Sequence, residues 1–363
     1  MHKSLPHILG ALLSIIVLGG IKAQYTDVIN SNRPSKSMGA FSVGKNVYQW
    51  EQGLSLRKGD FSSFQNASFS GLSSQIQLRV GLLKEQLEVV GVVDYQMDEL
   101  TYQNAVGNLV DSRKGLRDFS AGVKYLVYDP FRNTKKYKPN LYSYHANNRT
   151  RWRDLIPAVS IYAGAQFATG GVYPYQESFY PLFNFNYRPI TEPVVSATAT
   201  LILQQHLKPG LVLVHNVGMR YITATIQQKK LIGTLTYSTR EKWSLFGEYQ
   251  VDDSPLYRDL TLGMGVAYLL TDDIQLDMAF QHSMKATPKL LTTGIGVSYR
   301  IDKHNIWNGQ PQDFEEVKQG RKDRKKSFRE GKEARKSERR TNKGLRKLDK
   351  KQKRIERKLK KIG

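Results

Sequence analysis

Residues 292–301, TTGIGVSYRI, decide the fold. The odd-numbered positions from 293 to 301 are mostly apolar, and the even-numbered positions between them are small or polar. A two-residue period of this length predicts a β-strand with one apolar and one polar face. It is also the last such strand, because the chain continues from Lys303 into a loop and a long basic tail. We interpret it as the closing strand of a membrane β-barrel.

The same alternation occurs in eleven earlier segments. These are 46–56, 74–82, 87–98, 119–128, 155–168, 194–205, 211–222, 231–238, 243–251, 262–270 and 274–282. Together with 292–301 they make about twelve strands, an even number of roughly ten-residue segments such as bacterial outer-membrane barrels require. The sequence therefore predicts an all-β fold, an antiparallel transmembrane up-and-down barrel with a basic, partly helical C-terminal tail.

A soluble β-sandwich would show a similar alternation, so the connections between strands decide between the two. Connections at 83–86, 208–210, 239–242 and 271–273 are short, and the third, fifth, seventh, ninth and eleventh connections are longer, with 169–193 the longest of those five. Short periplasmic turns that alternate with longer outer loops are typical of a membrane barrel. The connection 129–154 breaks this pattern, because it is long, basic and aromatic where a short turn is expected.

Composition supports the same fold class. The 363 residues include 20 Tyr, 14 Phe and 29 Gly, which suits a barrel with aromatic girdles, and they include no Cys, which excludes disulfides and thiolate chemistry. The net charge of +23 lies mainly in the tail, because residues 313–363 hold 23 Lys and Arg against 9 Asp and Glu. No segment approaches the ~18 unbroken apolar residues of a transmembrane helix.

The chain divides into four parts. Residues 1–23 read as a secretory signal, with Lys3 before an apolar run at 8–21; a short membrane anchor is the alternative, but that run is short for a span. Residues 24–44 are expected to be a luminal or periplasmic segment, 45–302 the barrel, and 303–363 a basic periplasmic tail. This organisation indicates the outer membrane of a Gram-negative cell.

The tail contains one aromatic ring, Phe328, among the basic residues of 321–361. Export and the lack of interleaved rings argue against nucleic acid as the partner, although Lys and Arg could neutralise phosphates. The expected partners are peptidoglycan carboxylates, anionic lipid head groups or an acidic periplasmic protein, and a merely solvated tail remains an alternative.

Several stretches also resemble a known family. They are YTDVINSNRPS…GAFSVG (25–44), KYLVYDPF (124–131), KPNLYSYHAN (138–147), WRDLIPAVSIYAGAQF (152–167) and GIGVSYRID (294–302). They resemble a Bacteroidetes group of outer-membrane transporters, which is similar to the β-barrel family called "putative meta-pathway of phenol degradation". The resemblance covers 24–302 and leaves out the tail. It implies an outer-membrane barrel that passes small compounds, including hydrophobic or aromatic ones, and it supplies no catalytic residue.

The polar strand faces supply the candidate pore-lining residues. They are Gln49, Glu51, Gln77, Arg79, Asp94, Gln96, Lys124, Gln166, Asn216, Arg220, Glu248, Gln250, Asp277, Gln281 and Arg300. Polar and charged linings set pore selectivity, so these side chains could form a conduction path. Alternatively, salt-bridged side chains and the N-terminal segment fill the lumen and no solute passes.

Candidate ligand-capturing aromatic residues lie in the outer connection 169–193. They are Tyr173, Tyr175, Phe179, Tyr180, Phe183 and Phe185. Rings in an outer loop could stack on apolar ligands at the barrel mouth, or they could form an interfacial girdle.

No Gly-x-Ser-x-Gly elbow or His-Glu-x-x-His pair occurs, so we expect no enzyme, no catalytic residue, no metal and no cofactor. The sequence predicts an outer-membrane channel or transporter for small compounds. The alternative is a non-transporting envelope protein whose tail binds the cell wall, anionic lipid or a periplasmic partner.

Overall fold

The computed structural model describes residues 28–61, 67–104, 107–130, 155–167, 195–208, 210–224, 227–239, 242–255, 257–286 and 289–304, together with residue 336. The predicted signal, nearly all of the predicted tail, the aromatic connection and most of 129–154 lie outside these ranges. The chain divides into two units, Met1–His304 and Asn305–Gly363. The first unit contains the barrel.

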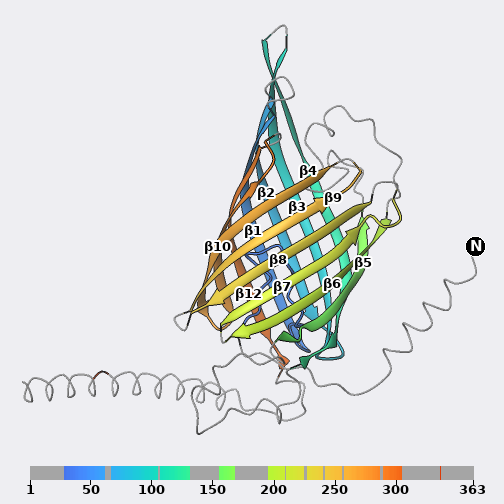
Figure 1. Cartoon of the computed structure of the whole chain (residues 1–363), viewed down its shortest axis with the longest axis vertical. Helices are drawn as coiled ribbons and strands as arrows, with labels where there is room; N and C mark the ends of the chain where they lie inside the picture. The colour runs from blue at the N-terminus through green and yellow to red at the C-terminus, as the bar shows by residue number, and fades with distance from the viewer. Residues whose placement is uncertain are drawn as a thin grey trace, which may run out of the picture. The chain divides into compact units, whose positions relative to one another are not determined.

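Twelve strands form the barrel (Figure 1). They are β1 Val47–Phe61, β2 Ala67–Gly81, β3 Leu87–Asn104, β4 Gly107–Tyr128, β5 Ala158–Phe167, β6 Val195–Lys208, β7 Leu211–Arg220, β8 Gln228–Ser238, β9 Trp243–Asp253, β10 Arg258–Thr271, β11 Ile274–Ser283 and β12 Lys289–Asp302. Each strand pairs antiparallel with its sequence neighbours, and β1 pairs with β12, so the sheet closes on itself. The predicted closed antiparallel twelve-stranded barrel is therefore confirmed.

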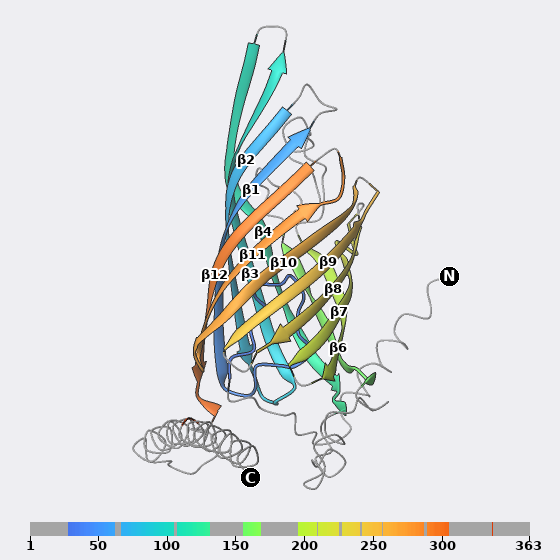
Figure 2. The same ribbon diagram turned by 60° about the vertical axis from the view of Figure 1, so that its left-hand side comes forward.

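The closing pair β1–β12 fixes the register of the ring. Val47 lies opposite Asp302 and Asp60 opposite Lys289, without a shift between them. We call the end of the barrel at Val47 and Asp302 the terminal end. The opposite end carries the long β3–β4 hairpin, which rises beyond the other strands (Figures 1 and 2).

Side-chain burial alternates along the strands as the sequence predicts. In β1, Gln49 and Glu51 are buried inside the ring, whereas Tyr48 and Trp50 are exposed on its outer surface. A polar interior with an apolar exterior is the reverse of a soluble protein and matches a barrel surrounded by lipid. Within the described residues, no helix is long and apolar enough to cross a bilayer.

Aromatic rings gather outside the terminal end. Tyr48, Tyr237, Trp243 and Tyr299 are exposed there, and Trp243 packs against its cross-strand neighbour Tyr268 with ring centroids 4.7 Å apart. Leu, Ile, Met and Val side chains continue the exposed band away from these rings. Rings that flank an apolar band are typical of the membrane–water interface.

Strands β3 and β4 are longer than predicted. Residues 99–118 were expected to form an outer loop, but all of them except 105 and 106 continue the two strands, with Asp98 opposite Arg113 and Asn104 opposite Gly107. The prediction was wrong because it relied on the apolar outer face. Beyond the lipid that face is not needed, whereas the backbone hydrogen-bond ladder continues.

Candidate functional site

Residues 28–46 lie inside the barrel before β1 begins (Figure 2). We call them the luminal segment. Ile29 N donates to Asp272 O (2.9 Å) in the β10–β11 turn, and Asn46 N donates to Gly81 O (3.0 Å) at the end of β2. Both of these contacts are at the terminal end. The segment therefore enters the lumen from the terminal end, reaches inward and returns to the same end.

A buried ionic cluster holds one side of the luminal segment. Arg79 on β2 donates to Glu88 on β3 (Nε–Oε1 2.7 Å) and to Glu51 on β1 (Nη1–Oε1 3.2 Å). Lys124 on β4 lies 3.2 Å from Glu88, and all four side chains are fully shielded from solvent. Arg79 also donates to Asn30 O (2.6 Å). Buried charges are tolerated only when they are paired and hydrogen-bonded, which these four are.

The backbone of the luminal segment supplies many of the partners. Lys124 Nζ donates to Gly39 O and Phe41 O, each at 3.0 Å. Ala40 is held from two strands, because Ser160 Oγ donates to its carbonyl (2.6 Å) and its amide donates to Gln204 Oε1 (2.8 Å). The segment forms no strand, so wall side chains satisfy backbone groups that would otherwise be buried without partners.

Further along the lumen, Asn216 on β7 binds both backbone groups of Met38. Its Oδ1 accepts from Met38 N (2.6 Å), and its Nδ2 donates to Met38 O (2.9 Å). On β9, Glu248 Oε2 accepts from the backbone amide of Lys36 (2.9 Å). In paired strands, the N–H and C=O of one residue bond to the backbone of its neighbour. Here the Asn216 side chain takes the place of that neighbouring backbone for Met38.

The wall binds the Arg33 side chain and leaves space for it. Its guanidinium makes two hydrogen bonds to Asp277 on β11, and a Cβ added to Gly53 or Gly296 would overlap it. Gly53 and Gly296 lie opposite each other on β1 and β12. A similar close approach occurs at Gly81, where a Cβ would overlap the carbonyl of Gly44. The barrel sequence thus leaves space for the luminal segment.

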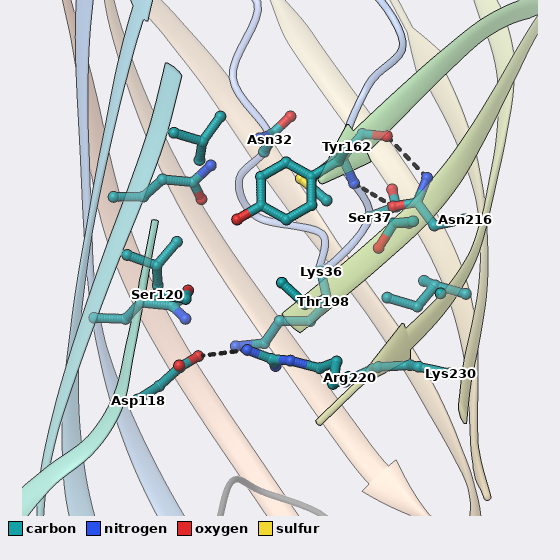
Figure 3. Close-up of a pocket in the computed structure, with 18 of the residues that line it drawn as sticks. Asn32, Lys36, Ser37, Asp118, Ser120, Tyr162, Thr198, Asn216, Arg220 and Lys230 are labelled. Carbon is teal, nitrogen blue, oxygen red and sulfur yellow. Dashed lines mark hydrogen bonds and ion pairs between the residues drawn. The ribbon is translucent and has the colours of Figure 1, made fainter. Parts of the chain in front are cut away.

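A cavity of about 180 Å³ lies against the luminal segment (Figure 3). Residues 32–33 and 35–38 of the segment form one side, and inward residues of β2 to β8 form the rest. On one side of it Asp118 forms an ion pair with Arg220, with Lys36 and Lys230 near Arg220 (Figure 3). Tyr162 covers another side, above the inward glycines Gly122 and Gly164.

A β-bulge brings two consecutive charged residues into this cavity. Asp94 pairs with Asp118 and Tyr95 with Leu116, so Arg117 is an extra residue in β4, and both Arg117 and Asp118 are buried. Arg117 forms an ion pair with Asp94, and Asp118 forms one with Arg220 (3.1 Å). Bulges commonly redirect side chains beside functional sites.

The fifteen predicted pore-lining residues all face the interior. Thirteen are buried, and Gln77 and Arg220 are half-buried. Those that contact the luminal segment are Gln49, Glu51, Arg79, Lys124, Asn216, Glu248 and Asp277. Those that line the cavity are Gln77, Asp94, Asn216 and Arg220.

The remaining five predicted pore-lining residues lie in the wall. Gln96 accepts from Arg57, Gln166 accepts from Arg220, and Arg300 pairs with Asp273 at 3.2 Å. Gln250 and Gln281 both donate to Glu248. These contacts are structural pairs, and whether solute contacts any of the fifteen residues stays a prediction. The six aromatic candidates Tyr173, Tyr175, Phe179, Tyr180, Phe183 and Phe185 lie outside the described residues.

Several important residues were missed from the sequence. Glu88 lies on the polar face of its strand and could have been included by that alternation. Arg33 and Lys36 lie in an aperiodic stretch. The sequence signals for Arg33 are the family-like motif around it and the glycines Gly53 and Gly296 that face it. Arg117 had no signal, because a strict two-residue period places it outside the ring.

A known protein family matches the barrel and most of the luminal segment. Residues 31–301 match the family described as "Putative MetA-pathway of phenol degradation". No curated protein matches the chain.

The chain is also similar to several solved structures at low sequence identity. An outer membrane channel from Pseudomonas putida F1 is 9% identical with a TM-score of 0.45, covering 74% of this chain and 99% of that one. The translocator domain of the autotransporter NalP from Neisseria meningitidis is 9% identical with a TM-score of 0.40, covering 71% and 89%. The CymD monoaromatic hydrocarbon channel is 9% identical with a TM-score of 0.36, covering 72% and 90%.

Proposed function

The chain belongs to the family described as "Putative MetA-pathway of phenol degradation", and from this premise we propose that it is an outer-membrane channel for small hydrophobic or aromatic compounds. One observation carries the proposal: a closed ring of strands with an apolar exterior encloses a polar lumen and a cavity of about 180 Å³. Such a ring provides a path across a bilayer without lipid contact. No catalytic residue is assigned.

The luminal segment makes this channel a gated one. Wall side chains from β1 to β7, β9, β11 and β12 bind it by hydrogen bonds or ion pairs. A solute that enters from the opposite end therefore meets the segment before it reaches the terminal end. In the proposal, passage requires that residues 33–38 leave the wall, and the fifteen inward residues form the path that remains.

We orient the terminal end toward the periplasm. Four of the five connections there are short, for example the one between Thr271 and Ile274, and the β4–β5 connection is the long exception. The β3–β4 hairpin extends far beyond the opposite end. Short periplasmic turns and long external extensions are the usual arrangement. The basic tail from residue 305 onward follows β12 and would lie in the periplasm.

The test is solute uptake into proteoliposomes that contain the full chain. Toluene and phenol represent small aromatic solutes, and glucose serves as a polar comparison. We expect aromatic uptake to exceed that of protein-free vesicles. Uptake equal to protein-free vesicles, even in the variant Arg33→Gln that frees the luminal segment from Asp277, would overturn the proposal.

The alternative function is a non-transporting envelope protein whose basic tail binds peptidoglycan, anionic lipid or a periplasmic partner. The observation that favours it is the number of wall contacts with the luminal segment. Deletion of residues 314–363 separates the two functions. A channel keeps its uptake without the tail, whereas an envelope anchor loses its sedimentation with purified peptidoglycan.

A further inference from the structure

The cavity beside the luminal segment has the size of a single aromatic ring. Its volume is about 180 Å³. A cavity of about 150 Å³ is enough to hold benzene in a protein interior. A disaccharide or a nucleotide would not fit without rearrangement of the wall, so the cavity selects a small ligand.

One side of the cavity is apolar. Val90 and Ile232 are 1% and 6% exposed, and Tyr162 is buried with its ring over two glycines. Met38 and Val92 pack against the cluster that contains Val90 and Tyr162. This side offers a ring-shaped ligand contact with an aromatic face and aliphatic side chains.

The charged side chains that line the cavity are matched within the protein. The ion pairs are Arg33–Asp277 (2.9 Å), Arg117–Asp94, Arg220–Asp118 (3.1 Å) and Lys230–Asp252 (3.7 Å). The charge of Lys36 acts on the carboxylates of Glu248 and Asp277. A charged ligand would have to displace a partner from one of these pairs, and a buried charge without a partner is costly. The cavity therefore favours a neutral ligand.

One neutral donor at the cavity lacks an acceptor. Asn32 lines the cavity and is 7% exposed, and its Nδ2 has no hydrogen-bond partner among the described residues. Its Oδ1 accepts from Gly39 N (3.1 Å), which identifies the other end of the amide as the donor. Asn32 and Tyr162 both belong to the lining drawn in Figure 3. A buried donor without a partner is costly, and an acceptor oxygen on a ligand would relieve that cost.

A carbonyl oxygen fits this donor with no further requirement. It accepts a hydrogen bond and brings neither a donor nor a charge. A ligand hydroxyl would bring a proton that needs an acceptor of its own. A carboxylate would bring a charge that the paired lining does not match.

We propose that this cavity binds a neutral single-ring aromatic ketone or aldehyde, with the carbonyl oxygen on Asn32 Nδ2 and the ring against Tyr162. The inference rests on the proposed channel and names the solute class that its lumen selects. Asn32 belongs to the luminal segment and Tyr162 to β5, so the occupant touches both the wall and the element that closes the path.

The test measures binding to the detergent-solubilised full chain by calorimetry, with acetophenone as the probe. Benzoate has the same ring with a carboxylate in place of the ketone. We expect acetophenone to bind at least about tenfold more tightly than benzoate, because the lining leaves no cation for the added charge. Benzoate binding as tight as that of acetophenone, or no binding of acetophenone, would overturn the inference.

Two asparagines of the luminal segment provide a matched pair of variants. Asn32 lines the cavity, whereas Asn30 is half-buried outside the lining. Cumene resembles acetophenone in shape, with a methyl group in place of the carbonyl oxygen. Asn32→Leu should weaken acetophenone binding about tenfold and leave cumene binding unchanged, whereas Asn30→Leu should change neither. An equal loss for both ligands in Asn32→Leu, or an equal effect of the two variants on acetophenone, would overturn the inference.

A third variant separates loss of the donor from loosening of the luminal segment. Asn32→Asp keeps an oxygen that can accept from Gly39 N and removes the donor. It should therefore weaken acetophenone binding at least as much as Asn32→Leu does. Acetophenone affinity that is unchanged in Asn32→Asp would show that the ligand does not bind this donor, and would overturn the inference.

The two proposals fail in different ways. Acetophenone binding without any solute uptake would refute the channel and keep the cavity assignment. Uptake of toluene without acetophenone binding would keep the channel and refute the assignment. The gel mobility of unheated variants, compared with heated samples, shows in each case that the barrel has folded.

Discussion

Arg33 and Asp277, 244 residues apart in the chain, form a two-point ion pair inside the barrel, with Nε–Oδ2 at 3.2 Å and Nη2–Oδ1 at 2.9 Å. The pair joins the luminal segment to β11 beside two facing glycines. A two-point arginine–carboxylate contact fixes orientation as well as position.

Arg33→Gln should loosen the luminal segment. A hydrogen bond to a charged group contributes about 1.5–3 kcal/mol, so the open fraction should rise about tenfold or more. Single-channel recording in planar bilayers measures it. Arg258→Gln is the control, because Arg258 pairs with Asp253 at an exposed site (79% and 35% of the two side chains). Equal open fractions in the two variants would show that Arg33 does not hold the gate.

A disulfide should lock the luminal segment. Ser31 Oγ and Ser298 Oγ lie 2.7 Å apart, and the chain has no native Cys. Under oxidation, Ser31→Cys/Ser298→Cys should abolish aromatic uptake, and a reductant should restore it. The control Ser238→Cys/Ser244→Cys joins two strands at an exposed site, where the Oγ atoms are 2.9 Å apart. Full uptake through the oxidised, cross-linked lock would mean that solute passes without movement of this segment.

Gly296→Val should displace Arg33 and keep the barrel. Its side chain would occupy the place of the guanidinium, whereas valine is favourable in a strand. We expect higher conductance and faster proteolysis of the luminal segment in the folded protein. Gly247→Val is the matched control on β9, because a Cβ there meets nothing within 4 Å. If Gly296→Val conducts like Gly247→Val, the inward glycines do not position the segment.

Arg79→Met should destabilise the barrel strongly. It leaves Glu51 and Glu88 buried at the terminal end with only Lys124 beside Glu88. Removal of one partner from a buried ion pair costs about 3–5 kcal/mol. Urea unfolding, followed by the heat-dependent gel shift, measures the loss.

Arg79→Met/Glu88→Gln should recover part of this loss, because one of the two carboxylates becomes neutral. Arg258→Met is the exposed control and should change the free energy of unfolding by less than about 1 kcal/mol. If Arg79→Met alone is as stable as Arg258→Met, the buried cluster around Arg79 does not stabilise the barrel.

Local sequence patterns were enough to predict the barrel wall. The alternation around Tyr299 and Arg300 gives the two faces directly, because the side-chain period of a strand is two. The same rule placed Gln49, Lys124 and Glu248 inside. The alternation could not show which groups these side chains bind. Lys124 binds the backbone of residues 39 and 41, which are more than eighty residues away in the sequence.

A luminal place for residues 24–44 was one of the two expected from the sequence, but the contacts of that segment and the β3–β4 extension were not predicted. Residues 28–46 have no period, because side chains of the wall, and not a neighbouring strand, bind many of their backbone groups. The extension keeps the hydrogen-bonded backbone of a strand. It lacks the alternating apolar outer face by which a membrane strand is recognised in the sequence, since it lies beyond the lipid. The bulge at Arg117 shifts the phase by one residue, and no local pattern marks that shift.

The luminal segment begins at the β10–β11 turn, with Ile29 bonded to Asp272, and ends beside Gly81, and both points are at one mouth of the ring. The segment is a loop that enters and leaves the barrel at the same end and does not pass through it. It can retract and return without either chain terminus crossing the bilayer and without any of the twelve wall strands separating. In the proposed channel, opening and closing therefore need only the wall contacts of this segment to break and form again.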